Sequence, residues 1–107
     1  MAEPLTESVS PWLPEQDRIR LATLGKLIEE LNEASSRAAR CIIQGLDETD
    51  PDTGRTNRAE LEREISDVLA CIEMASIELH VEPDPQRQDG KVDHFQRWHE
   101  LIDEAGK

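Results

Sequence analysis

The sequence predicts an all-α protein, and three observations support that prediction. Apolar residues recur at three- and four-residue intervals over two long segments and one shorter segment, which is the period of an amphipathic helix. No segment shows the strict alternation of a half-buried strand. Proline and glycine separate the helical segments. We expect a helical bundle of two long antiparallel helices plus a short C-terminal helix, completed by oligomerisation.

The N-terminal part of the chain is predicted to form an extended arm at residues 1–14 and then the first long helix. Three prolines stand among polar residues in the arm, and Trp12 either anchors it or lines a base pocket. The single helical domain then spans 15–107. Its first helix is expected to begin at Glu15 and to stop at Gly45. The apolar stripe of this helix comprises Leu21, Leu24, Leu27, Ile28, Leu31, Ala34, Ala38 and Ile42.

A polar loop and two further helices are predicted for the rest of the chain. Residues 46–57 contain Pro, Gly and four acidic residues, which is typical of a loop, and Asn57 with Glu60 forms a variant of the capping box. The helix after it is expected to end before Pro83. Its stripe comprises Leu61, Ile65, Val68, Leu69, Ile72 and Leu79. Residues 86–91 are expected to form a polar turn before a short helix that carries Val92, Phe95, Trp98, Leu101 and Ile102.

Composition limits the size of the core and the kind of partner. With 107 residues, 36% hydrophobic residues and three aromatics, the chain fits one domain with a lean core, so burial between subunits is expected. The net charge of −12, from 24 acidic and 12 basic residues, excludes most nucleic-acid binders because a polyanion would be repelled. A phosphorylated ligand remains compatible if metal ions bridge it to carboxylates.

Cysteine spacing and the lack of apolar runs predict a cytoplasmic protein without a membrane partner. Cys41 and Cys71 have no metal-binding spacing and fall in apolar helical segments, so we expect buried free thiols. No stretch resembles a signal peptide or approaches the roughly 18 apolar residues of a membrane span. Unpaired thiols persist in the reducing cytoplasm.

Two pairs of carboxylates are the strongest candidates for chemistry. Glu30 and Glu33 lie one turn apart on the first helix, and Glu64 and Asp67 have the same spacing on the second. Each pair borders the apolar stripe, so packing of the two stripes would bring the four groups together. Converging carboxylates repel unless a cation neutralises them, and Mg²⁺ prefers oxygen ligands. Ion pairs with nearby basic side chains (Lys26, Arg37 and Arg40) are the alternative.

These residues resemble the signature of the MazG-like all-α nucleoside triphosphate pyrophosphohydrolases. The segment Glu29–Glu33 matches the family's EExxE motif and Glu64–Asp67 its ExxD motif, and the resemblance covers roughly residues 20–80. It implies a homodimer or homotetramer that converts (d)NTP to (d)NMP and pyrophosphate. Members of the family act in control of the nucleotide pool in bacteria and phages, and some phage members act on guanine nucleotides.

The resemblance also implies roles for individual residues. Mg²⁺, with Mn²⁺ as a substitute, would be held by Glu30, Glu33, Glu64 and Asp67, and Glu29 or Glu33 could accept the proton of the attacking water. The basic side chains that are candidates to contact the phosphates, or are simple surface cations, are Lys26, Arg37 and Arg40, with Arg55 and Arg58 as weaker candidates. The non-enzymatic alternative is an acidic helical interaction module, which predicts no affinity for Mg²⁺.

Overall fold

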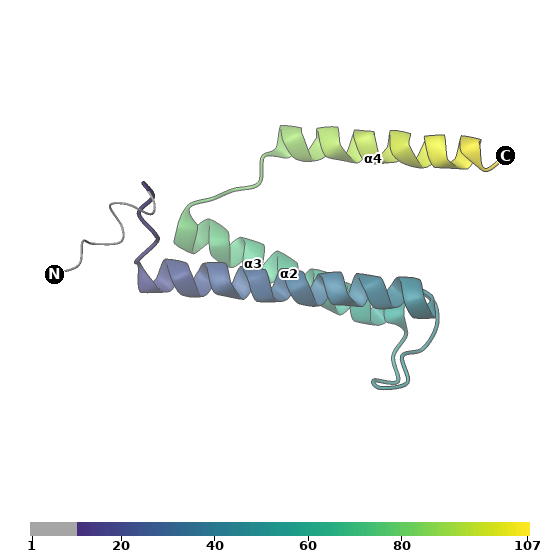
Figure 1. The fold of residues 1–107 in the computed structure, drawn as a ribbon, viewed down its shortest axis with the longest axis horizontal. Helices are drawn as coiled ribbons and strands as arrows, with labels where there is room; N and C mark the ends of the chain where they lie inside the picture. The colour runs from purple at the N-terminus through teal and green to yellow at the C-terminus, as the bar shows by residue number, and fades with distance from the viewer. Residues whose placement is uncertain (1–10) are drawn as a thin grey trace.

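The computed structural model describes residues 11–107, and this part of the chain confirms the predicted all-α class. It contains α2 (Arg18–Gln44), α3 (Asn57–Leu79) and α4 (Pro85–Ala105). Within these residues there is no strand, and the one isolated bridge joins Thr49 to Thr56 in the loop between α2 and α3. Helices α2 and α3 form an antiparallel hairpin, and α4 lies apart from it (Figure 1).

The observed ends of α2 follow from its capping residues. The helix begins at Arg18 because the side chain of Asp17 accepts a hydrogen bond from the Arg20 amide at 2.9 Å, so the start predicted at Glu15 is wrong. The predicted stop is confirmed at Gly45, whose φ is 106°. A side chain there would be strained by that angle, and its Cβ would lie 2.9 Å from Cγ of Glu48.

Two further boundaries differ from the sequence-based expectation. Thr56, not Asn57, is the N-cap of α3, and its side chain accepts a hydrogen bond from the Ala59 amide at 3.1 Å. Residues 86–91 are helical and do not form a turn. Asp84 caps α4 by accepting from the amides of Gln86 and Arg87, and Pro85 occupies the first turn, where a missing N–H costs nothing.

The hairpin has two different faces on either side of the α2–α3 contact. Residues of α2 that face α3, such as Leu27 and Ala34, are half-buried. A residue one position after such a facing residue lies about 100° further round the helix, and a residue one position before it lies about 100° the other way. Because α3 runs antiparallel to α2, the residues that follow the facing residues of α3 lie on the same side of the hairpin as those of α2. The apolar face therefore comprises Leu24, Ile28 and Leu31 of α2 with Ile65, Leu69 and Ile72 of α3. The acidic face comprises Lys26, Glu29 and Glu33 of α2 with Asp67 and Met74 of α3.

The hydrophobic core of a single chain is very small. Ala75 is the one buried apolar residue among those described, whereas Ile28 and Leu69 on the apolar face are each 60% exposed. Exposed apolar surfaces of this kind are typical of interaction sites. None of α2, α3 and α4 has the length and apolar character that crossing a membrane requires.

Helix α4 has no packing contact with the hairpin. Within residues 11–107, no Cα atom of α4 comes within 8 Å of a Cα atom of α2 or α3. Helix α3 ends at His80, which has a left-handed φ of 56°, and residues 80–84 lead to α4 without helical structure. The position of α4 is therefore set by this short connection and not by packing within the chain.

Candidate metal and phosphate site

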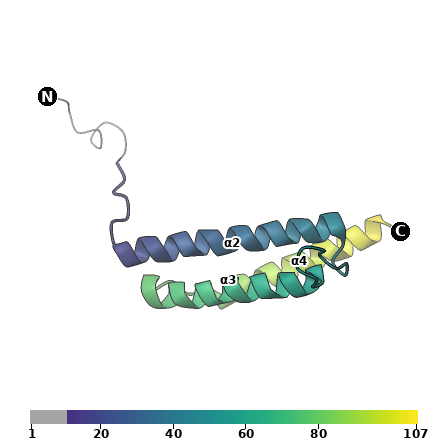
Figure 2. The ribbon, with the colours of Figure 1, turned by 90° about the horizontal axis from the view of Figure 1, so that it is seen from below.

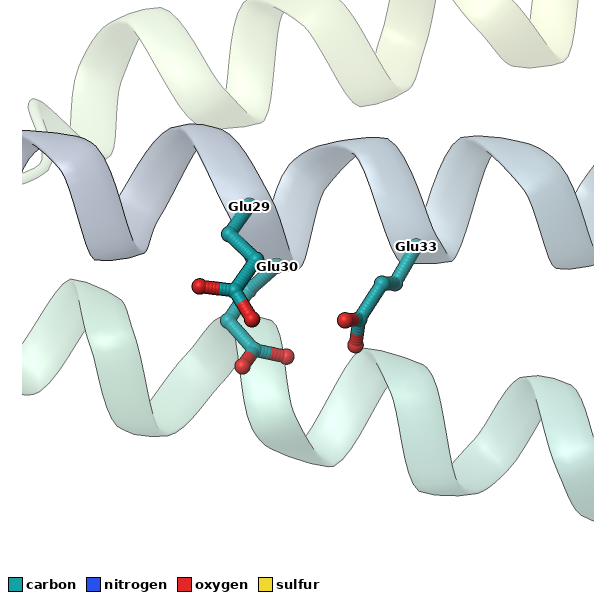
Figure 3. A group of neighbouring side chains, drawn as sticks. All are labelled: Glu29, Glu30 and Glu33. Carbon is teal, nitrogen blue, oxygen red and sulfur yellow. The ribbon is translucent and has the colours of Figure 1, made fainter.

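The four predicted carboxylates converge at the middle of the hairpin. Ligand oxygens of Glu30, Glu64 and Asp67 lie within 4.8 Å of one another, and so do those of Glu29, Glu30 and Glu33. Glu30 belongs to both groups, and Glu30 and Glu33 point from α2 toward α3 (Figure 3). The two helices thus bring both motifs into one acidic cluster, defined here as Glu29, Glu30, Glu33, Glu64 and Asp67.

Two oxygens of this cluster are buried without a hydrogen-bond partner among the described residues. They are Oε2 of Glu30 and Oε2 of Glu64. Burial, together with the charges of Glu33 and Asp67, raises the pKa of the Glu30 carboxyl above its usual value. Buried acceptors that lack a donor are costly unless something else satisfies them. The donor set is entirely carboxylate, which suits a hard divalent cation.

Lys26 lies at one edge of the acidic cluster and compensates part of its charge. Its Nζ lies 3.3 Å from Oε2 of Glu29 and 3.9 Å from Oε1 of Glu30. The hydrogen bond to Glu29 raises the pKa of the Lys26 amine. One ammonium cannot neutralise five carboxylates, so the cluster retains a strong negative potential and room for a second cation.

A polar pocket of about 170 Å³ adjoins the other edge of the cluster. Glu33 and Glu64 line one part of it, and Ser36, Arg37 and Arg40 line the rest. The side chain of Arg40 is 42% exposed, whereas that of Arg37 is only 12% exposed. Carboxylates and guanidinium groups on the same pocket can hold a cation and an anion side by side, which is the charge pattern of a metal–phosphate complex.

The arginines of this pocket are held by a fully buried aspartate that the sequence analysis did not single out. Oδ2 of Asp50 accepts hydrogen bonds from Nη1 of Arg37 at 2.8 Å and Nη1 of Arg40 at 3.1 Å. Asn57, also fully buried, accepts from Nη1 of Arg37 at 3.1 Å and donates to Gln44 and to the Gly45 carbonyl. This network fixes the loop against the end of α2.

The ionised form of Asp50 should contribute to stability. Arg37, the Asp52 amide and Arg40 lower the pKa of Asp50 from 3.8 to about 2. Because the folded pKa lies below the unfolded one, this stabilisation is present above pH 3.8 and is lost as the pH falls through about 2.

We therefore expect Asp50→Asn to melt at least about 10 °C below the unmodified chain at neutral pH, because it removes the buried carboxylate that Arg37 and Arg40 share and leaves Arg37 with Glu60, 3.5 Å away, as its remaining ion-pair partner. The difference should shrink as the pH approaches 2, as followed by circular dichroism. Asp52→Asn is the matched control, since Asp52 lies in the same loop with its side chain 80% exposed. Equal melting temperatures for the two variants at neutral pH would contradict the role of Asp50.

Arg55 and Arg58, the weaker phosphate candidates, both form ion pairs within the structure. Nε of Arg55 donates to Oε1 of Glu60, and this contact lowers the pKa of Glu60. Nη2 of Arg58 lies 2.8 Å from Oδ1 of Asp47, with both side chains more than half exposed. Neither arginine lines the polar pocket.

An apolar pocket of about 350 Å³ lies along the hairpin on the far side of Lys26. Its lining is largely hydrocarbon and sulfur, and it consists of Ile19, Ala22, Thr23, Lys26, Cys71, Met74 and Glu78. Cys41 and Cys71 are free, as predicted, but they are half-buried and not buried. One feature of the sequence points to this apolar pocket, namely the small side chains of Ala22 and Thr23.

Comparison of the chain with protein-family models, with curated proteins and with solved structures finds no match. The chemistry of the site therefore has to be argued from its geometry and from the two motifs. The geometry places an acidic cluster between a pocket lined by arginines and an apolar pocket.

Proposed function

We propose that this protein is a Mg²⁺-dependent nucleoside triphosphate pyrophosphohydrolase that produces a nucleoside monophosphate and pyrophosphate. The observation that carries the proposal is the acidic cluster, in which Glu30 and Glu64 each bury an oxygen without a partner. Such oxygens are satisfied by a divalent cation, and the cation in turn binds phosphates. The resemblance to MazG-like enzymes supports the same reaction.

The ligands in this proposal are Glu30, Glu33, Glu64 and Asp67, with Mn²⁺ able to replace Mg²⁺. Bound there, the ion would supply neutralisation of the phosphate charge and activation of a water. Glu29, which is more than half exposed and lies beside the cluster, is available to accept a proton from that water, as is Glu33. Lys26 hydrogen-bonds to Glu29 and keeps its carboxylate in place.

The two pockets suit the two ends of the substrate. Arg40 has guanidinium N–H groups beyond the one that Asp50 uses, and its partial exposure leaves them available to phosphate oxygens. Arg37 supports the pocket wall mainly through Asp50 and Asn57. The apolar pocket lined by Cys71 and Met74 would take the nucleobase, since a flat ring buries well against hydrocarbon and sulfur. A guanine nucleotide is the first substrate to test.

The experiment that tests this function is incubation of the protein with each of the eight common nucleoside triphosphates and Mg²⁺, followed by separation of the products. We expect monophosphate and pyrophosphate in equal amounts from at least one nucleotide. Release of orthophosphate alone, or no turnover with any nucleotide, would overturn the proposal. In the second case the acidic helical interaction module becomes the better description.

Binding of Mg²⁺ should raise the melting temperature of the protein, and the rise should depend on pH. Because the folded pKa of Glu30 is raised, ionising its carboxyl destabilises the fold as the pH increases through that pKa. A cation removes this penalty only where the ligands are ionised. At saturating Mg²⁺ we expect an increase of about 10 °C near pH 7.5 and a smaller one near pH 5.

Differential scanning fluorimetry can measure this shift, with two variants as controls. Glu30→Gln should abolish the effect of Mg²⁺, whereas Glu62→Gln should retain it because Glu62 is an exposed residue of α3 outside the acidic cluster. A Mg²⁺ shift of equal size at both pH values would argue against a site built on Glu30.

The proposal includes association of two or four copies in the cytoplasm. The apolar face is defined by six aliphatic residues (Leu24, Ile28, Leu31, Ile65, Leu69 and Ile72), and within the described chain nothing covers it. A second copy presents the same surface, so two hairpins can pack face to face about a twofold axis as a four-helix bundle. The free thiols of Cys41 and Cys71 are compatible with a reducing compartment.

A further inference from the structure

Helix α4 is amphipathic, and its apolar stripe is uncovered in a single chain. Val92, Phe95, Trp98 and Ile102 recur at intervals of three and four residues, and each is about half exposed. The opposite side of the helix is charged, with Asp93, Arg97, Glu100 and Glu104. Such a helix is stable when its stripe packs against another apolar surface.

The hairpin of the same chain does not provide that surface. Packed helices have axes 8–10 Å apart, whereas no Cα atom of α4 comes within 8 Å of one in α2 or α3. Since Cα atoms lie about 2.3 Å from each helix axis, the axes are separated by more than about 12 Å. The five residues 80–84 can span about 17 Å, which leaves room for one intervening layer of helices about 10 Å thick.

The layer has to lie against the apolar face. Figures 1 and 2 together place α4 over one face of the hairpin and not beside its edge. The right-handed turn of α2, with α3 beside it, identifies that face as the one that carries Leu24, Ile28 and Leu31. The uncovered apolar face of the hairpin therefore lies on the side of α4, and the two are not packed together.

We propose that the hairpin of a second copy of this chain fills the space between them, so that α4 packs on the partner and not on its own hairpin. This inference rests on the face-to-face dimer proposed above but not on the catalytic activity. In that arrangement the apolar faces of the two hairpins meet, and the outer surface of each hairpin is its acidic face. Helix α4 of one chain then lies across the acidic face of the other.

The acidic face offers apolar residues for α4 to cover. Ile19 and Met74 are each more than half exposed, and both line the apolar pocket. Phe95 and Trp98 supply the large side chains that such a surface lacks. Each apolar pocket would thus be closed by α4 of the other chain, so one chain alone would hold an incomplete site.

Photo-crosslinking in mixed dimers tests this arrangement with the full-length chain. A chain with p-benzoylphenylalanine in place of Phe95 is mixed, through unfolding and refolding, with an excess of isotopically labelled chain that retains Phe95. After irradiation, mass spectrometry identifies the crosslinked peptides and shows which chain each came from. The control places the photoreactive residue at Asp93, on the charged side of α4.

We expect the unlabelled α4 peptide to be joined to labelled peptides that contain residues 19–26 or 71–78. If the unlabelled α4 peptide is joined mainly to these segments of the unlabelled chain, although labelled chain is present in excess, then α4 folds back onto its own hairpin. That result would overturn the inference. Crosslinking at Phe95 no stronger than at Asp93 would also overturn it. Light scattering on the same samples separates these outcomes from failure of the dimer itself.

Discussion

Replacement of Glu30 by Gln, or of Asp67 by Asn, should lower nucleotide turnover by about 1,000-fold while leaving the helical content unchanged. Each substitution removes the negative charge but keeps the size and shape of the side chain. Ligand oxygens of both residues lie within 4.8 Å of one another and of Glu64. A bound metal supplies several kcal/mol of charge stabilisation in the transition state, and each 1.36 kcal/mol is tenfold in rate.

The control for these two substitutions is a carboxylate that lies outside the acidic cluster. Glu62→Gln removes an equal charge from an exposed position of α3, so its turnover should stay close to that of the unmodified protein. Turnover and circular dichroism are measured on all three variants at saturating Mg²⁺. Normal activity of Glu30→Gln or Asp67→Asn would remove that residue from the metal site.

Replacement of Ile28 by Glu should dissociate the oligomer and unfold much of the hairpin. Ile28 lies at the centre of the apolar face and is 60% exposed in the single chain. In a twofold dimer the substitution puts two charges into the interface and also removes two buried isoleucines. We expect the dissociation constant to rise by at least about 100-fold. Helicity should fall with it, because Ala75 is the one buried apolar side chain described within the chain.

Ile43→Glu is the control for that experiment. Ile43 belongs to the same helix and is 82% exposed, but it lies about 200° round the helix from Cys41, which faces α3. The same charge at this position should leave the mass from light scattering and the melting temperature nearly unchanged. A monomeric, fully helical Ile28→Glu chain would contradict the idea that the apolar face is an interface essential for folding.

The sequence predicted the helices and the acidic cluster because both depend on local periodicity. Glu30 and Glu33, or Glu64 and Asp67, lie one turn apart in any α-helix. The expectation that the two apolar stripes pack on each other is only partly met, because Leu27 of the first stripe faces α3 whereas Leu24, Ile28 and Leu31 are exposed. The predicted stop at Gly45 was also confirmed, since only glycine accepts its backbone angle without strain.

Other features could not be predicted because they depend on contacts between distant residues. Arg37 and Arg40 of α2 compensate the charge of Asp50, which lies in the following loop. Nothing in the sequence of that loop identifies Asp50 as fully buried. The prediction that residues 86–91 form a turn was wrong because the capping by Asp84 and Pro85 outweighed the polar composition. The position of α4 could not be predicted because α4 does not pack on α2 or α3, so no pairing of apolar stripes within the chain determines it.

The backbone of His80 has a consequence for the direction in which the chain leaves α3. A non-glycine residue in the left-handed region costs about 1 kcal/mol or more, and glycine at position 80 would avoid that cost. Glycine would also allow many more directions for the chain that follows it. Histidine at this position costs some conformational free energy, but it restricts the direction of the chain after α3. In the proposed dimer this restriction helps α4 to reach the hairpin of the partner.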